Sequence, residues 1–215
     1  MIRIDGPRLP PASGQPADAL VVFLHGYGAD GNDLIDLGRA FQPHLPGAAF
    51  VSPHAPQPCG MAPMGRQWFP LTLRDPDEFR EGAVAATPAL DAFLDAERDR
   101  LGIADERIVL VGFSQGTMMA LHVGLRRPRP LGAIVGYSGA LPGPEFLSEV
   151  RSRPPITLIH GDRDEVLPID HLHEATAALA AAGVATQFHV CPGLAHGIDQ
   201  RGLALGLAAI RNAIG

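Results

Sequence analysis

The chain contains no lysine, and all 17 of its basic side chains are arginines. Mechanisms that need a lysine amine, such as Schiff-base formation, are therefore excluded. Cysteine is scarce as well: Cys59 and Cys191 lie far apart and lack the spacing of metal ligands. We therefore expect no disulfide framework and predict a cytoplasmic protein in which both thiols are idle.

Long apolar runs are also missing. No segment approaches the length that crosses a bilayer, and the first residues lack the apolar stretch of a signal peptide. The net charge of −6 offers no basic surface to a nucleic acid. We expect no stable membrane insertion and no nucleic-acid partner. What is present is 46% hydrophobic residues in a chain of 215, which predicts a single domain over residues 1–215.

Short apolar runs alternate with longer helical patterns along the chain. Strands are predicted at 20–24, 48–52, 107–111, 132–136, 156–160 and 186–190. Helices are predicted at 33–41, 78–101, 115–126, 169–182 and 200–214. Unbroken Val, Ile and Leu runs are typical of strands that are buried on both faces. The alternation predicts an α/β fold with a mainly parallel central sheet and helices on both faces.

Proline marks two places where this pattern is interrupted. Pro88 should kink the second predicted helix, or that helix should begin near Thr87. Residues 53–76 hold six prolines and two glycines, and no regular element is expected there. A long ordered loop in a compact domain is usually functional.

The apolar run 108–111 leads directly into residues 112–116, which match the pattern Gly-x-Ser-x-Gly around Ser114. A strand, a sharp turn and a helix in this order form a nucleophile elbow, which holds a serine hydroxyl at the tip of a sheet. Glycines flank the serine because side chains there would collide with the backbone. We predict that Ser114 is a catalytic nucleophile.

A serine hydroxyl needs a base, normally a histidine that is oriented by a carboxylate. In this fold class both follow the serine along the chain. The carboxylate candidates, which follow the strand 156–160, are Asp162, Asp164 and Glu165. Local reasoning does not choose among them, because any of them could instead cap the next helix.

Five histidines lie in the region that should supply the base: His160, His171, His173, His189 and His196. His196 is favoured because it lies on a glycine-flanked loop just after the last predicted strand. His189 lies inside that strand, and His171 and His173 at a helix start are interpreted as surface residues. A zinc pair made by the latter two would lack a third ligand with suitable spacing.

A developing oxyanion needs two backbone N–H donors. One should be the amide of Gln115, and the other should come from the loop after strand 20–24. That loop reads His-Gly-Tyr-Gly, so the amide of Tyr27 is the expected donor and His25 should order the loop. Residues 26–31 also match a dinucleotide-binding Gly-x-Gly-x-x-Gly, but no acidic residue ends a suitable second strand.

Taken together, these motifs resemble the phospholipase/carboxylesterase family, the branch of the α/β hydrolases that holds small carboxylesterases and acyl-protein thioesterases. The matching segments run in order over nearly the whole chain: 24–30, 53–56, 68–69, 112–116, 160–164 and 193–197. The resemblance implies that Asp164 is the acid, His196 the base, and Tyr27 and Gln115 the oxyanion donors. It also implies an α/β-hydrolase fold with little or no lid, no cofactor, no metal and often a homodimer.

The hypothesis is a serine carboxylesterase that hydrolyses small to medium acyl esters. The alternatives are a lysophospholipase or acyl-protein thioesterase and, more remotely, a non-catalytic hydrolase-like binding protein. Substrate-pocket walls are predicted among the large apolar residues near the site. They are Met61, Met64, Trp68, Phe69 and Leu167, for each of which ordinary core packing is the alternative.

Overall fold

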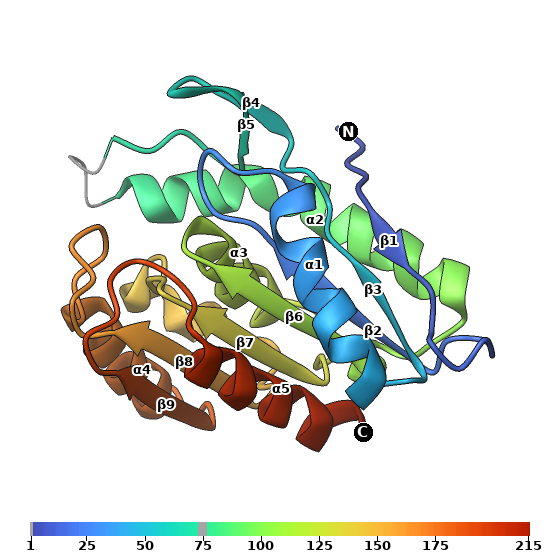
Figure 1. Ribbon diagram of the computed structural model, residues 1–215. Helices are drawn as coiled ribbons and strands as arrows, with labels where there is room; N and C mark the ends of the chain where they lie inside the picture. The colour runs from blue at the N-terminus through green and yellow to red at the C-terminus, as the bar shows by residue number, and fades with distance from the viewer. Residues whose placement is uncertain (1, 73–76) are drawn as a thin grey trace.

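The computed structural model describes residues 2–72 and 77–215, and its centre is a seven-stranded sheet in the order β1-β3-β2-β6-β7-β8-β9 (Figure 1). Its strands are β1 Arg8–Leu9, β2 Ala19–Leu24, β3 Ala48–Val51, β6 Ile108–Phe113, β7 Ala133–Tyr137, β8 Ile156–Gly161 and β9 Thr186–Cys191. All neighbours pair in parallel except β1, which pairs antiparallel with β3. The predicted α/β fold with a mainly parallel sheet is confirmed.

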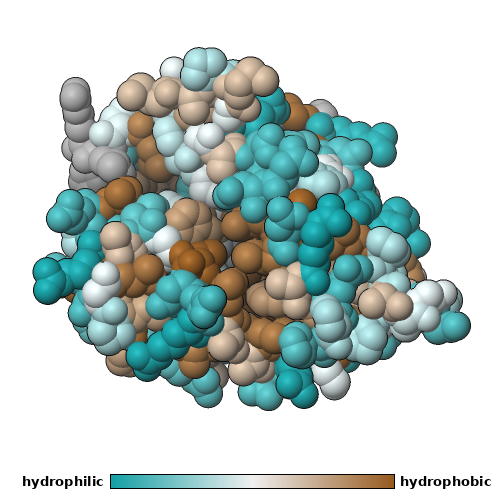
Figure 2. Space-filling view, viewed as in Figure 1, coloured by the Kyte–Doolittle hydropathy of each residue, from teal (hydrophilic) through white to brown (hydrophobic). Residues whose placement is uncertain are grey.

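Helices cover both faces of the sheet. The α-helices are α1 Gly31–Phe41, α2 Glu78–Leu101, α3 Gln115–Gly124, α4 Asp170–Ala181 and α5 Gln200–Ile214, and 3-10 turns are formed by Gln42–His44, Asp105–Arg107 and Pro144–Glu149. Helices α1 and α5 lie on one face and α2, α3 and α4 on the other, so that two apolar cores form (Figure 1). Figure 2 shows apolar side chains gathered on the visible face of the molecule, and Leu37 on α1 and Leu203 and Leu207 on α5 pack against the core while only partly buried.

Local signals explain where the helices begin and end. The Asp30 side chain caps α1 by accepting the Asn32 N–H, and Asp199 caps α5 in the same way. Gly102, at φ 66°, ends α2 in the left-handed conformation that favours glycine. Helix α2 runs through Pro88, so the expectation of a start near Thr87 is wrong. Pro88 is exposed, so the carbonyl that loses its helical N–H partner can be solvated.

The expectation that residues 53–76 contain no regular element is also wrong. Strands β4 Gln57–Cys59 and β5 Ala62–Gln67 form an antiparallel hairpin that extends from the molecule above α2 (Figure 1). A two-stranded ribbon leaves one edge of each strand unpaired, which is how it accommodates Pro58 and Pro63. Residues 73–76 of the predicted loop lie outside the described residues. Among the helices within the described ranges, none is long and apolar enough to cross a bilayer.

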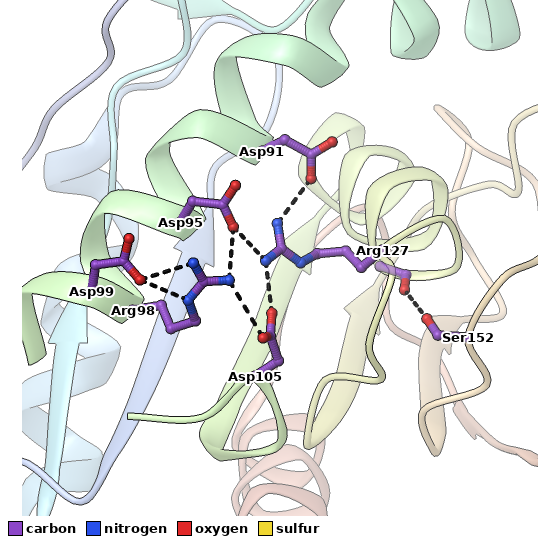
Figure 3. Close-up of polar contacts among 8 residues, drawn as sticks. Asp91, Asp95, Arg98, Asp99, Asp105, Arg127 and Ser152 are labelled. Atoms are coloured by element: carbon purple, nitrogen blue, oxygen red, sulfur yellow. Dashed lines mark hydrogen bonds and ion pairs between the residues drawn. The ribbon is translucent and has the colours of Figure 1, made fainter. Parts of the chain in front are cut away.

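An ion network around the buried side chains of Arg127 and Asp105 lies at the amino ends of the strands (Figure 3). The Arg127 guanidinium, whose side chain is 2% exposed, donates to Asp91 at 3.0 Å, Asp95 at 2.7 Å and Asp105 at 2.7 Å. Arg98 also contacts Asp95 and Asp105, at 3.1 and 3.5 Å. A buried charge is tolerated only when it is paired in this way. The network joins α2 to the end of α3 and to the turn before β6.

At the other edge the strands end together. The register pairs Leu24 with Gly112, Phe113 with Tyr137, and Gly161 with Cys191. The loops that follow β2, β6, β7, β8 and β9 therefore meet at one edge. Open parallel sheets place their ligand sites at this carboxyl edge.

Candidate active site

Ser114 lies in a strained turn between β6 and α3, with φ 54° and ψ −117°. Its N–H donates to the Tyr137 carbonyl at 2.9 Å, which fixes the turn to the neighbouring strand. A Cβ on Gly112 would collide with the backbone of Thr117, and one on Gly116 with the Leu24 carbonyl. The two glycines therefore allow the elbow to close, and the serine is exposed by 8%.

The loop after β2 lies directly against this serine. A Cβ on Gly26 would be 3.4 Å from the Ser114 Cβ, so the glycine lets the two backbones approach. The buried His25 donates from Nδ1 to the Gly26 carbonyl at 2.8 Å and accepts the Ala55 N–H at Nε2 at 3.0 Å. Burial lowers the pKa of His25 to about 4, so its imidazole is neutral and orders the loop.

The side chain of Gln115 fixes the segment that follows β5. Its Oε1 accepts the Trp68 N–H at 2.8 Å, and its Nε2 donates to the Phe69 carbonyl at 2.7 Å. The Trp68 indole N–H in turn donates to the His25 carbonyl at 3.0 Å. The sequence predicted a role only for the backbone amide of Gln115. The side-chain hydrogen bonds were missed because the one to Trp68 joins residues that are 47 positions apart in the sequence.

The backbone amides of Tyr27 and Gln115 remain available. Neither donates to a protein acceptor within the described part of the chain. The neighbouring groups of the loop are occupied: Gly28 N–H donates to the Arg66 carbonyl at 2.9 Å, and Arg66 N–H to the Ala29 carbonyl at 2.7 Å. The β4–β5 hairpin thereby holds the loop that carries Tyr27, and the Tyr27 N–H itself stays without a protein acceptor in the described ranges.

Of the three predicted carboxylates, Asp164 is the one that contacts His196. Its Oδ2 lies 2.7 Å from His196 Nδ1, and its Oδ1 accepts the N–H groups of Val166 and Leu167, both at 2.9 Å. Burial alone would raise the pKa of Asp164, but the hydrogen bonds from Leu167 N–H and His196 outweigh burial and hold this pKa below its ordinary value. The carboxylate is therefore ionised and assigns the Nδ1–H tautomer to His196.

The other two carboxylates are exposed. Asp162 accepts the Gly193 N–H at 2.6 Å and so holds the start of the loop that carries His196. Glu165 is exposed beside the Asp164 turn. Local reasoning could not separate these residues because their burial depends on how the loop after β8 packs.

The imidazole of His196 packs against the residue that precedes Ser114. Its ring packs 5.0 Å, centroid to centroid, from the ring of Phe113, the residue before the serine. Ser138, which follows β7, donates from Oγ to the Gly197 carbonyl at 3.3 Å. The His196 side chain is 19% exposed, so part of it is accessible to solvent.

The remaining histidine candidates have other surroundings. His160 is buried beside Asp164, with Nε2 at 3.3 Å from Oδ2. His171 and His173 lie in the first turn of α4, where their rings contact Phe79 and Phe188. His189 lies on β9. Within residues 2–72 and 77–215, no group of three His, Cys, Asp or Glu side chains has a geometry that could hold a metal ion.

The five predicted pocket residues divide into two sets. Met61 and Met64, 83% and 91% exposed, project from the hairpin. Trp68, Phe69 and Leu167 are at most 3% exposed and belong to the core behind the loops. A cavity of about 410 Å³ lies between the start of α2, the loop after β7 and the start of α4, and its walls include Phe79, Leu141 and Ala175. None of the five residues lines that cavity.

Fold and site geometry together define an α/β hydrolase. The chain belongs to the phospholipase/carboxylesterase family, whose profile it matches over residues 11–212. It is 29% identical to the esterase YpfH of Escherichia coli over 201 residues, which cover 93% of this chain and 85% of the relative. It is 32% identical to acyl-protein thioesterase 1 of Saccharomyces cerevisiae over 169 residues, 72% of this chain and 74% of the relative.

A crystal structure of esterase PE8 superposes with a TM-score of 0.95 at 44% sequence identity, covering 99% of this chain and 100% of that chain. The family predicted from the sequence motifs is therefore confirmed. So is the predicted enzyme class, a hydrolase of carboxylic ester bonds.

Proposed function

We propose that this protein is a serine carboxylesterase that hydrolyses small to medium acyl esters through an acyl-enzyme intermediate. One observation carries the proposal. The buried Asp164 carboxylate holds His196 through a 2.7 Å hydrogen bond at the same sheet edge as the strained Ser114 turn. A nucleophile, a base and an acid that orients the base are the groups that acyl transfer requires.

The first half-reaction forms the acyl-enzyme. His196 Nε2 takes the proton of Ser114 Oγ as this oxygen attacks the ester carbonyl carbon. Asp164 stabilises the imidazolium that results. The imidazolium then gives its proton to the leaving alcohol oxygen as the carbon–oxygen bond of the ester breaks.

The second half-reaction repeats these steps with water. His196 removes a proton from water, the hydroxide attacks the acyl-enzyme, and Ser114 leaves with the proton that His196 returns. The free amides of Tyr27 and Gln115 bind the oxyanion in both halves. Losing one such donor costs on the order of 3 kcal/mol of transition-state stabilisation.

The test uses nitrophenyl esters of increasing acyl chain length, with Ser114→Ala as the control. The proposal predicts the highest kcat/KM for short acyl chains, no activity in S114A, and labelling of Ser114 by a fluorophosphonate probe. If the probe labels Ser114 but the protein hydrolyses none of the nitrophenyl esters, the proposed class of ester substrate is wrong. An unlabelled Ser114 would favour the non-catalytic binding protein and overturn the mechanism.

A lysophospholipase or acyl-protein thioesterase is the second candidate, favoured by the match to the yeast thioesterase. Oxoesters and thioesters use the same groups, so the site geometry supports both. An optimum at long acyl chains, or a higher kcat/KM for thioesters than for matched oxoesters, would select this alternative. The cytoplasmic location and the homodimer stay predictions.

A further inference from the structure

A second histidine lies against the Asp164 carboxylate on the side away from the solvent. The imidazole of His160 is buried, with 2% of the side chain exposed, and its Nε2 is 3.3 Å from Asp164 Oδ2. The same nitrogen is 2.8 Å from the Leu167 carbonyl. Two imidazoles, those of His160 and His196, therefore share one carboxylate oxygen.

The protonation of His160 follows from these partners. A carbonyl can only accept, so Nε2 carries the hydrogen and donates it to Leu167. The titratable groups facing this imidazole are Asp164 on the same loop, His196 from the loop after β9, and His171 from α4. Burial lowers the pKa of His160 in spite of the opposing effects of the Leu167 carbonyl and Asp164, so the ring stays neutral.

His160 and Asp164 hold the backbone of Leu167 from both sides. The Leu167 carbonyl accepts from His160, and the Leu167 N–H donates to Asp164 Oδ1 at 2.9 Å. The turn from Asp164 to Leu167 cannot shift without breaking one of these bonds. The carboxylate that orients His196 is thus itself oriented by a turn that His160 anchors.

We propose that His160 is a positioning residue for the reaction: its neutral imidazole anchors the turn and holds Asp164 Oδ2 in the geometry that His196 needs. This inference rests on the proposed function. His160 touches no reacting atom and acts through Asp164. Its Nε2–H dipole also lies beside Oδ2, where it reduces the negative potential that stabilises protonated His196.

The test compares three variants of one side chain. Gln places an amide N–H where His160 has Nε2–H, whereas Asn is too short to reach Leu167 and Phe has no donor. We expect His160→Phe and His160→Asn to lower kcat by about tenfold to a hundredfold with KM nearly unchanged, because small misplacements of catalytic groups cost this much. We expect His160→Gln to restore most of kcat.

The pH profile separates positioning from a purely structural role. Without the Nε2–H dipole, the acid limb of kcat/KM should move to higher pH by ~0.5 unit in H160F and H160N, and return in H160Q. The same shift should appear in a nuclear magnetic resonance titration of the His196 ring in Ser114→Ala protein, which needs no turnover. Should H160F not fold, the pair H160N and H160Q decides.

The control is His173→Phe, an exposed histidine on α4 that should leave both the rate and the profile unchanged. An acid limb that stays in place in H160N, or H160Q as slow as H160N, overturns the positioning role. If S114A retains its activity, the proposed function itself has failed. If S114A is inactive and the profile of H160N is unchanged, only the inference about His160 has failed.

Discussion

The two ends of the sheet treat polar groups in opposite ways. At the amino ends, Arg127 is surrounded by three carboxylates that all bond to it. At the carboxyl ends, Ser114 is held at a strained φ of 54°, and the Tyr27 and Gln115 amides have no protein acceptor within the described chain. At the amino ends the two terminal nitrogens of Arg127 are paired with carboxylates, although its Nε has no acceptor among the described residues, whereas the carboxyl ends leave two backbone donors free for a ligand.

This difference shows how one sheet separates stability from reactivity. Strain and unpaired donors cost free energy, and they persist only where the surrounding structure enforces them. The network of Arg127 fixes α2 and α3 from below, while the bonds of Gln115 and His25 fix the loops around the elbow from above. Substitutions at the two ends should therefore change different measured quantities.

The largest effect is expected at Ser114. Ser114→Gly should lower kcat by about four orders of magnitude or more, because the nucleophile is lost. It should also raise the free energy of unfolding by ~1 kcal/mol, because glycine accepts a positive φ without strain. An ester hydrolysis assay measures kcat, and urea unfolding measures the free energy of unfolding. A destabilised S114G protein would show that the turn is not strained.

The next effect is expected at the amino ends. Arg127→Leu should lower the free energy of unfolding by about 3–5 kcal/mol, because it leaves the buried Asp105 charge without its main partner. The kcat of the folded fraction should change less than about threefold, since no group of the site is touched. Denaturant unfolding and active-site titration of the same sample check both numbers.

Arg39→Leu is the matched control for this variant. Arg39 pairs with Asp36 at 2.9 Å, but both side chains are mostly exposed. Its loss should cost less than about 1 kcal/mol. Equal destabilisation by R39L and R127L would remove the distinction between a buried network and a surface pair.

A smaller, pH-dependent effect is expected at His122 on α3. This imidazole is buried, its Nδ1 has no hydrogen-bond partner among the described residues, and burial lowers its pKa to about 4, helped by Arg126 and Arg80 and opposed by Glu149. The unfolded chain binds the proton near pH 6.5 and the native state only near pH 4, so stability is lost as the pH falls between these values.

His122→Leu should remove this loss. Relative to the wild type, the variant should gain about 1–2 kcal/mol on going from pH 8 to pH 5. Urea midpoints of both proteins at the two pH values measure the gain. An identical stability difference at pH 8 and pH 5 would show that His122 does not titrate on unfolding.

The smallest effect on stability is expected at the exposed methionines. The double variant M61S/M64S should change the free energy of unfolding by less than about 0.5 kcal/mol. If these side chains contact the acyl group, KM should rise about threefold to tenfold for long acyl esters and stay constant for acetyl esters. Leu141→Trp, which places a larger side chain on the wall of the 410 Å³ cavity and narrows it, is the comparison: whichever variant raises KM with chain length identifies the acyl-binding surface.

The sequence predicted most of the sheet and the helices because their signals are local. The predicted helix 200–214 matches α5 at both ends, and the strand runs agree with the structure to within one or two residues. The β4–β5 hairpin was missed because Pro58 and Pro63 predict loop, and only the pairing of two strands shows how both fit. Strand β1 has two residues, too few for any periodicity.

Contacts between distant segments could not be predicted from the residues. Asp162, Asp164 and Glu165 have the same local chemistry, and only the packing of the loop after β8 buries Asp164 beside His196. The bonds of Arg127 to Asp91 and Asp95 span 36 and 32 residues, so nothing in the local pattern signals them. The family resemblance singled out Asp164 among the three carboxylates, which local chemistry could not do. It gave no information about the contacts of Arg127.

The hairpin is anchored at its base and unconstrained at its tip. Arg66 exchanges two backbone hydrogen bonds with the Gly28–Ala29 segment, whereas Gly60 has open space around it. A segment of different length could therefore be inserted between Cys59 and Ala62. It would change the exposed end of the hairpin without displacing the Gly28–Ala29 segment. The molecule carries a ready insertion point for engineering selectivity.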